Sequence, residues 1–147
     1  MPTIRIQGTD LTYEEKDIIR FDEGLIGMPH LRRMVLINQT DIAPFLLLCS
    51  LDDSQLAFLV LEAVVHFPRY TPRLSDGVRE QLGLVAGEPP LLLVTIAIAP
   101  EWMKSTINLR APLVVAASTM RGRQIVLTDS PYKLAEPLPL AWAVAAA

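Results

Sequence analysis

The feature that most constrains the fold is a series of apolar runs in the C-terminal half of the chain, separated by short polar connectors. Residues 91–98 form one continuous run that is rich in β-branched side chains, and shorter runs follow at 113–116 and 124–127. A basic Arg-Gly-Arg turn at 121–123 separates the last two runs. Short apolar runs bounded by proline or glycine are typical of strands buried on at least one face. The pattern therefore predicts a sheet.

The N-terminal half also predicts strands. Residues 3–7 alternate between polar and apolar side chains with a period of two, which indicates a half-buried strand. Residues 45–51 and 56–61 are apolar runs joined by the connector 52–55, whose length favours an antiparallel hairpin. Further strands are predicted at 11–13, 18–21 and 33–37.

One helix is predicted over residues 75–83. Ser75 can cap its N-terminus, Val78 and Leu82 share one face, and Gly83 can end it. Residues 28–33 could form a single helical turn. Strands joined by short turns with so little helix predict a mainly β fold, a small antiparallel β-barrel-like domain with one or two short helices inserted.

The length of 147 residues predicts one domain. We assign residues 1–136 to this domain and residues 137–147 to an apolar C-terminal tail that either docks on it or frays. The charged fraction of 20% argues against disorder. The one cysteine, Cys49, excludes an internal disulfide and lies in an apolar run, where a small buried side chain is expected.

The sequence predicts a cytoplasmic protein. No apolar signal segment follows the first residues, and the longest apolar run, 91–99, is far shorter than the ~20 residues that span a bilayer. A membrane anchor formed by the apolar tail is the minor alternative. A single reduced thiol also fits the cytoplasm.

The charge pattern predicts no direct nucleic-acid binding. The net charge is −3, whereas nucleic-acid binding needs a concentrated basic face. The arginines are dispersed along the chain, and we interpret them as solvated strand ends and turns. They occur as Arg32 and Arg33, Arg69 and Arg73, and Arg121 and Arg123.

Asp52 and Asp53 are the most notable acidic pair. Two carboxylates can bind a divalent cation or act as acid and base, which suggests a small β-barrel metal-dependent enzyme or ligand carrier completed by His30 or His66. The simpler interpretation is that one aspartate caps its own turn by accepting backbone N–H bonds. No nucleotide-binding, nucleophile-elbow or zinc-protease motif is present, so we expect no cofactor and no enzymatic activity.

Asn108 is unusual because asparagine is disfavoured inside strands. Either its amide bonds the neighbouring backbone in a bulge, or it presents a polar contact to a partner. Pro112 lacks a backbone donor, so the strand begins there or lies at an edge, where a docking rim is plausible. Trp102 lies in a connector, and we interpret it as a cover on the core rather than a binding anchor.

Four segments together resemble the FliW family of flagellar assembly factors. Residues 18–27 are similar to that family's Ile-x-Phe-x-Glu-Gly-x-x-Gly opening. The other three segments are 50–58, 106–115 and 122–127, and the four in order span nearly the whole chain. Departures occur near the C-terminus, where no Arg-His pair follows Tyr132.

The resemblance implies a β-barrel-like protein that binds flagellin and the translational repressor CsrA. Flagellin would sequester the protein until it is exported, and the released protein would then antagonise CsrA away from its RNA surface. The contact residues expected for these partners are Asn108 with Ile107 and Leu109, then Asp52 and Asp53. We expect a monomer or weak homo-oligomer. A third hypothesis is a structural subunit whose apolar surface is covered by self-association.

Overall fold

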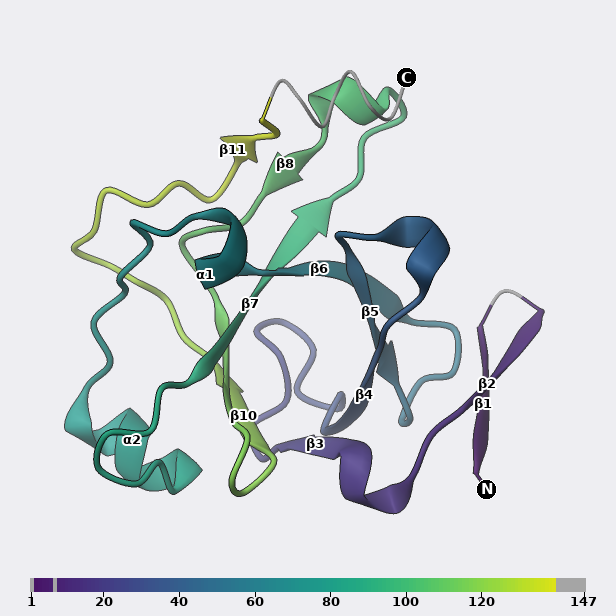
Figure 1. The fold of residues 1–147 in the computed structure, drawn as a ribbon, viewed down its shortest axis with the longest axis horizontal. Helices are drawn as coiled ribbons and strands as arrows, with labels where there is room; N and C mark the ends of the chain where they lie inside the picture. The colour runs from purple at the N-terminus through teal and green to yellow at the C-terminus, as the bar shows by residue number, and fades with distance from the viewer. Residues whose placement is uncertain (1, 7, 140–147) are drawn as a thin grey trace.

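The computed structural model describes residues 2–6 and 8–139, and its centre is a closed β-barrel (Figure 1). Seven strands form the ring in the order β3, β4, β5, β6, β7, β9 and β10, and β10 returns to β3. The prediction of a mainly β, barrel-like fold with short helices is confirmed. The bounds of the seven strands are β3 Ile18–Phe21, β4 Arg33–Ile37, β5 Leu46–Ser50, β6 Ala57–Glu62, β7 Leu91–Ala97, β9 Leu113–Ala116 and β10 Arg121–Gln124.

One pair of strands departs from the antiparallel prediction. β10 lies parallel to β3, with Gly122 beside Phe21, although about a hundred residues separate the two strands in the chain. A Cβ atom on Gly122 would lie 2.6 Å from the Phe21 ring. The absent side chain therefore lets this buried aromatic ring close the barrel at the parallel pair.

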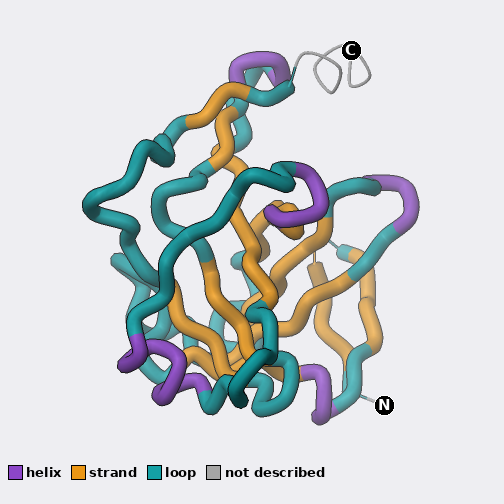
Figure 2. The backbone as a smooth tube through the Cα atoms, turned by 60° about the vertical axis from the view of Figure 1, so that its left-hand side comes forward, coloured by secondary structure: helices purple, strands orange, loops and turns teal. Residues whose placement is uncertain are grey.

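Among the described residues, four further strands lie outside the ring. β1 (Thr3–Ile6) and β2 (Thr9–Thr12) form a separate antiparallel hairpin, which stands beside the barrel in Figure 2. β8 (Thr106–Ile107) pairs with the end of β7, and β11 (Glu136–Pro137) pairs with β8. β11 thus spans the boundary predicted at residue 136, and residues 140–147 of the predicted tail lie outside the described residues.

The helical elements are short. α2 (Asp76–Leu82) confirms the predicted helix: the Ser75 hydroxyl accepts the N–H of Val78, and Gly83 ends the helix in the left-handed conformation. The helical turn predicted at 28–33 is wrong, because Met28 bridges back to Leu25 and two turns form instead. The other helical elements are α1 (Ala63–His66), η1 (Glu15–Asp17), η2 (Thr40–Ile42) and η3 (Trp102–Lys104).

The core has three apolar clusters because several strands are buried on both faces. Alternate side chains of the ring strands, from Phe21 and Met34 round to Leu113, fill the barrel. The outer face of β6, β7 and β9 lies under α2 and the preceding crossover. Burial on two faces explains why these strands read as continuous apolar runs.

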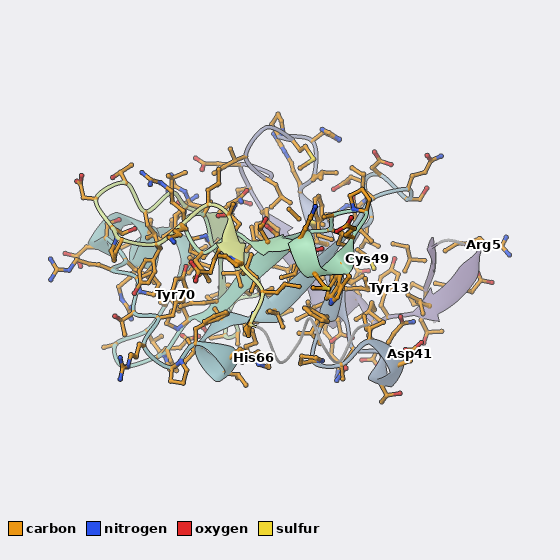
Figure 3. The ribbon with its side chains drawn as sticks, turned by 90° about the horizontal axis from the view of Figure 1, so that it is seen from above. Arg5, Tyr13, Asp41, Cys49, His66 and Tyr70 are labelled. Carbon is orange, nitrogen blue, oxygen red and sulfur yellow. The ribbon has the colours of Figure 1, made fainter. Side chains whose placement is uncertain are left out.

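The third cluster lies between the barrel and the N-terminal hairpin. Ile4 of the hairpin packs with Ile18, Val35 and Cys49 on the outer face of β3, β4 and β5. Figure 3 shows Cys49 in the body of the molecule and Arg5 at the far side of the hairpin. Cys49 is fully buried, which confirms its predicted role as a small buried side chain, and this burial raises the pKa of its thiol to about 11.

Candidate functional site

Residues 108–112 form a bulge at the point where β7 changes partner. Ile96 of β7 pairs with Ile107 of β8, and Leu93 of β7 pairs with Leu113 of β9. Between these two pairs, β7 runs only from Leu93 to Ile96, whereas the facing segment runs from Ile107 to Leu113 and advances by twice as many residues. The extra residues leave the ladder as a bulge, which we name the Asn108 bulge. Before the bulge, the strand facing β7 is limited to the two residues of β8.

The Asn108 side chain shapes this bulge. Its Oδ1 atom accepts the N–H groups of Arg110 at 3.1 Å and Ala111 at 3.0 Å. Its own backbone N–H donates to the carbonyl of Thr95 at 2.9 Å, which keeps the bulge attached to β7. The prediction that the Asn108 amide bonds neighbouring backbone is confirmed.

The carbonyl groups of the bulge accept hydrogen bonds from two other segments. The Tyr70 hydroxyl donates to the carbonyl of Leu109 at 2.6 Å. Burial, helped by the neighbouring Tyr132 phenol, raises the pKa of Tyr70, so this hydroxyl keeps its proton. The remaining donors lie at the end of β10 and just after it: Gln124 Nε2 donates to Ala111, Ile125 N–H to Pro112, and Leu127 N–H to Arg110.

The predicted contact residues of this segment differ in exposure. Ile107 is fully buried and Leu109 is 6% exposed, and both pack in the apolar cluster outside β6, β7 and β9. Asn108 is half-buried. The two apolar side chains therefore serve mainly in packing. Of the three contact residues predicted in this segment, Asn108 is the one with appreciable exposure.

Asp52 fastens the β5–β6 connector to the start of β4. Its Oδ2 atom accepts the backbone N–H groups of Arg32 at 2.9 Å and Arg33 at 2.7 Å, and its Oδ1 lies 3.2 Å from Arg33 Nε. Burial alone would raise the pKa of Asp52, but these N–H groups and the guanidinium together lower it. Asp52 therefore serves as a charged acceptor between two strands.

Asp53 caps its own turn, as the simpler interpretation of the acidic pair predicts. Its Oδ1 accepts the N–H of Gln55 at 3.1 Å. The hydroxyl of Ser50 in turn accepts the N–H groups of Asp52 and Asp53. Across residues 2–6 and 8–139, no three histidine, cysteine, aspartate or glutamate side chains gather as a metal ion would require. The pair thus has no third ligand in this part of the chain.

An open groove of about 1230 Å³ lies beside the Asn108 bulge, and the sequence did not predict it. One wall is the segment 123–132, which bonds the bulge, and the other is the crossover 71–76. Tyr132 joins the walls, because its hydroxyl accepts the N–H of Thr71 at 2.9 Å. The groove forms from segments distant in sequence, and the exposed side chains of Ile26 and Val126 are its only local signal.

Trp102 covers the core, as predicted. Its ring meets the Phe45 ring edge-on, with centroids 5.4 Å apart, and packs against the outer apolar cluster. Within the described part of the chain, no helix has both the length and the hydropathy to cross a bilayer.

Comparison with known proteins places this architecture in a family. The family model described as FliW protein matches residues 5–138. The flagellar assembly factor FliW of Clostridium beijerinckii is 34% identical over 129 residues, which cover 88% of this chain and 92% of the relative. The corresponding protein of Geobacillus kaustophilus is 35% identical over 124 residues, covering 84% and 85%.

The structural comparison agrees with the sequence comparison. A crystal structure of the flagellar assembly factor FliW superimposes with a TM-score of 0.83 at 31% identity, covering 92% of this chain and 96% of that one. The relatives are named as assembly factors and not as enzymes. The chain belongs to the FliW family.

Proposed function

We propose that this protein is a non-enzymatic flagellar assembly factor of the cytoplasm that binds flagellin and antagonises CsrA by direct protein–protein binding. The observation that carries the proposal is the match to FliW proteins over 84–88% of the chain. The use of Asp52, Asp53 and Asn108 as acceptors for backbone N–H groups also fits a binding scaffold better than a reaction centre.

The proposed mechanism is an exchange of partners. Flagellin that has not been exported occupies the protein, and CsrA is then free to repress flagellin translation. Export of flagellin releases the protein, which binds CsrA and relieves repression. The protein contacts neither nucleic acid nor membrane in this scheme, and it works as a monomer or weak homo-oligomer.

Calorimetry with purified flagellin and CsrA from the same genome tests the proposal. We expect saturable binding of each protein, and release of CsrA-bound flagellin mRNA leader when this protein is added without flagellin. Prior addition of flagellin should prevent that release. Absence of binding to both proteins would refute the proposal.

The contact residues are tested by substitutions that keep the fold. Asn108→Asp retains the acceptor for the bulge but alters the half-exposed amide, and Asp53→Asn retains an acceptor for Gln55. If these side chains contact a partner, each variant should weaken binding of flagellin or CsrA about fivefold, equivalent to about 1 kcal/mol. Unchanged affinity for both partners would place the contacts elsewhere.

A further inference from the structure

Three arginines that are distant in sequence lie abreast on the barrel. Arg20 of β3 is the register partner of Arg33 on β4 and of Arg121 on β10. Register partners on neighbouring strands point to the same face with Cβ atoms about 5 Å apart. All three residues are exposed. We name Arg33, Arg20 and Arg121 the arginine row; its strands β4, β3 and β10 lie side by side at the lower end of Figure 1.

The protein itself balances the charge of the arginine row only in part. Arg33 pairs with Asp52 at 3.2 Å, and Arg20 lies 3.7 Å from Glu15 in an exposed pair that contributes little stability. Arg121 has no carboxylate partner among the described residues, and its guanidinium donates to the carbonyl of Gln81. Like charges directly opposite each other destabilise a sheet, so the row needs a reason other than folding.

The chemistry of the row favours carboxylates of a protein over nucleic acid. Arginine presents a planar fork that bonds a carboxylate through two parallel hydrogen bonds. Glu15 and Asp52 lie against the row, and the whole chain has a net charge of −3, so no extended basic field is available for a phosphate backbone.

We propose that the arginine row is a docking surface for an acidic segment of a partner protein. Aspartate or glutamate side chains of that segment bond Arg20 and Arg121, and Arg33 extends the contact while Asp52 holds it in place. The partner's carboxylates replace Glu15 at Arg20 and provide Arg121 with its missing counter-charge. The inference does not depend on flagellin or CsrA being that partner.

Fluorescence anisotropy with a labelled decaglutamate peptide at low salt, about 50 mM, tests the surface. The wild-type protein should bind the peptide, and R20Q/R121Q should weaken binding about fivefold or more. The matched control is R69Q/K133Q, which makes the same change in net charge at exposed residues outside the row. The control should keep binding within about twofold of wild type, since long-range charge is screened.

Two further measurements complete the test: the melting temperature of R20Q/R121Q and the binding of a labelled single-stranded RNA. The melting temperature of R20Q/R121Q should equal or exceed that of wild type, because like-charge repulsion across the strands is removed. A lower melting temperature would make the row structural and overturn the proposal. It is also overturned if wild type does not bind decaglutamate, if both double variants lose binding equally, or if a labelled single-stranded RNA binds more tightly than the peptide. Neither probe is flagellin or CsrA, so failure here leaves the proposed function standing.

Discussion

At the scale of single residues, polar side chains in this protein act mainly as acceptors for backbone donors that lie outside a regular ladder. Asn108 accepts two such donors in the bulge, and Asp52 accepts two at the start of β4. A buried or half-buried N–H without a partner is costly, so each acceptor fixes the path of several residues. These residues are therefore the first places where a point substitution should be measurable.

Removal of the Asn108 acceptor should destabilise the protein. Asn108→Ala leaves the N–H groups of Arg110 and Ala111 without their acceptor, and we expect a loss of about 1–3 kcal/mol in the free energy of unfolding. Urea denaturation measures this change. Asn108→Asp keeps an acceptor at the same position and is the control. Equal destabilisation by the two variants would contradict the role assigned to Oδ1.

Asp52 should contribute to stability in a pH-dependent way. Its pKa in the folded protein lies below that of an unfolded aspartate, which is about 3.9. Its contribution is therefore present above the unfolded value and is lost as the pH falls through the folded value. Asp52→Asn should be less stable than wild type at neutral pH, and this difference should shrink on acidification. Urea denaturation across that range measures it; a constant difference would contradict the prediction.

At the scale of elements, glycines have opposite roles in a strand and in a helix. Gly122 of β10 faces the Phe21 ring, where a Cβ would lie 2.6 Å away, whereas the nearest atom that a Cβ on Gly77 in α2 would meet outside the helix backbone is the Ser75 hydroxyl, at 3.9 Å. The first glycine permits close packing of two strands. The second gives α2 no packing benefit and has poor helix propensity.

The two glycines provide a matched pair of substitutions. Gly122→Ala should destabilise the protein by about 1–3 kcal/mol, because the added methyl group overpacks the core at the parallel pair. Gly77→Ala should instead stabilise it by up to about 1 kcal/mol through helix propensity. Thermal denaturation of both variants checks the signs. Tolerance of alanine at residue 122 would show that the Phe21 ring can move aside.

At the scale of the whole molecule, the closed barrel and the attached N-terminal hairpin differ in how their strands are paired. β9 is paired on both sides, with β7 and β10, whereas β1 and β2 pair only with each other. The hairpin is held to the barrel by the cluster around Ile4, and an isolated two-stranded hairpin is marginally stable in water. The two parts should therefore open with different free energies.

Hydrogen exchange should reveal this difference. We expect amide protons of β9 to exchange only through global unfolding, and those of β1 and β2 to exchange faster through local opening. Native-state exchange followed by mass spectrometry, with peptides covering the hairpin and residues 113–116, checks the order. Equal protection of the two segments would mean that the hairpin and the barrel unfold together.

The sequence by itself determined most of the strands, the capped helix and the barrel class, because these follow from local periodicity and turn chemistry. The turn predicted at 121–123 and the strand predicted at 124–127 are wrong, since residues 121–124 form strand β10 and residues 125–127 lie outside it. Residues 91–98 read as a buried strand, and Ser75 and Gly83 marked the ends of α2. Asn108 and the acidic pair were noticed because their residue types are unusual at those positions, and their hydrogen bonds explain why.

Only the tertiary structure decided what depends on contacts between distant segments. The parallel pairing of β10 with β3 requires ring closure, and no local pattern near either strand specifies it. The same pairing brings Arg20 beside Arg121, so arginines that looked dispersed in the sequence form a row. Burial of Ile107 in β8 and of Leu109 in the Asn108 bulge likewise follows from their packing in the apolar cluster outside β6, β7 and β9. Local propensity fixes the elements, whereas register between remote strands fixes which side chains share a surface.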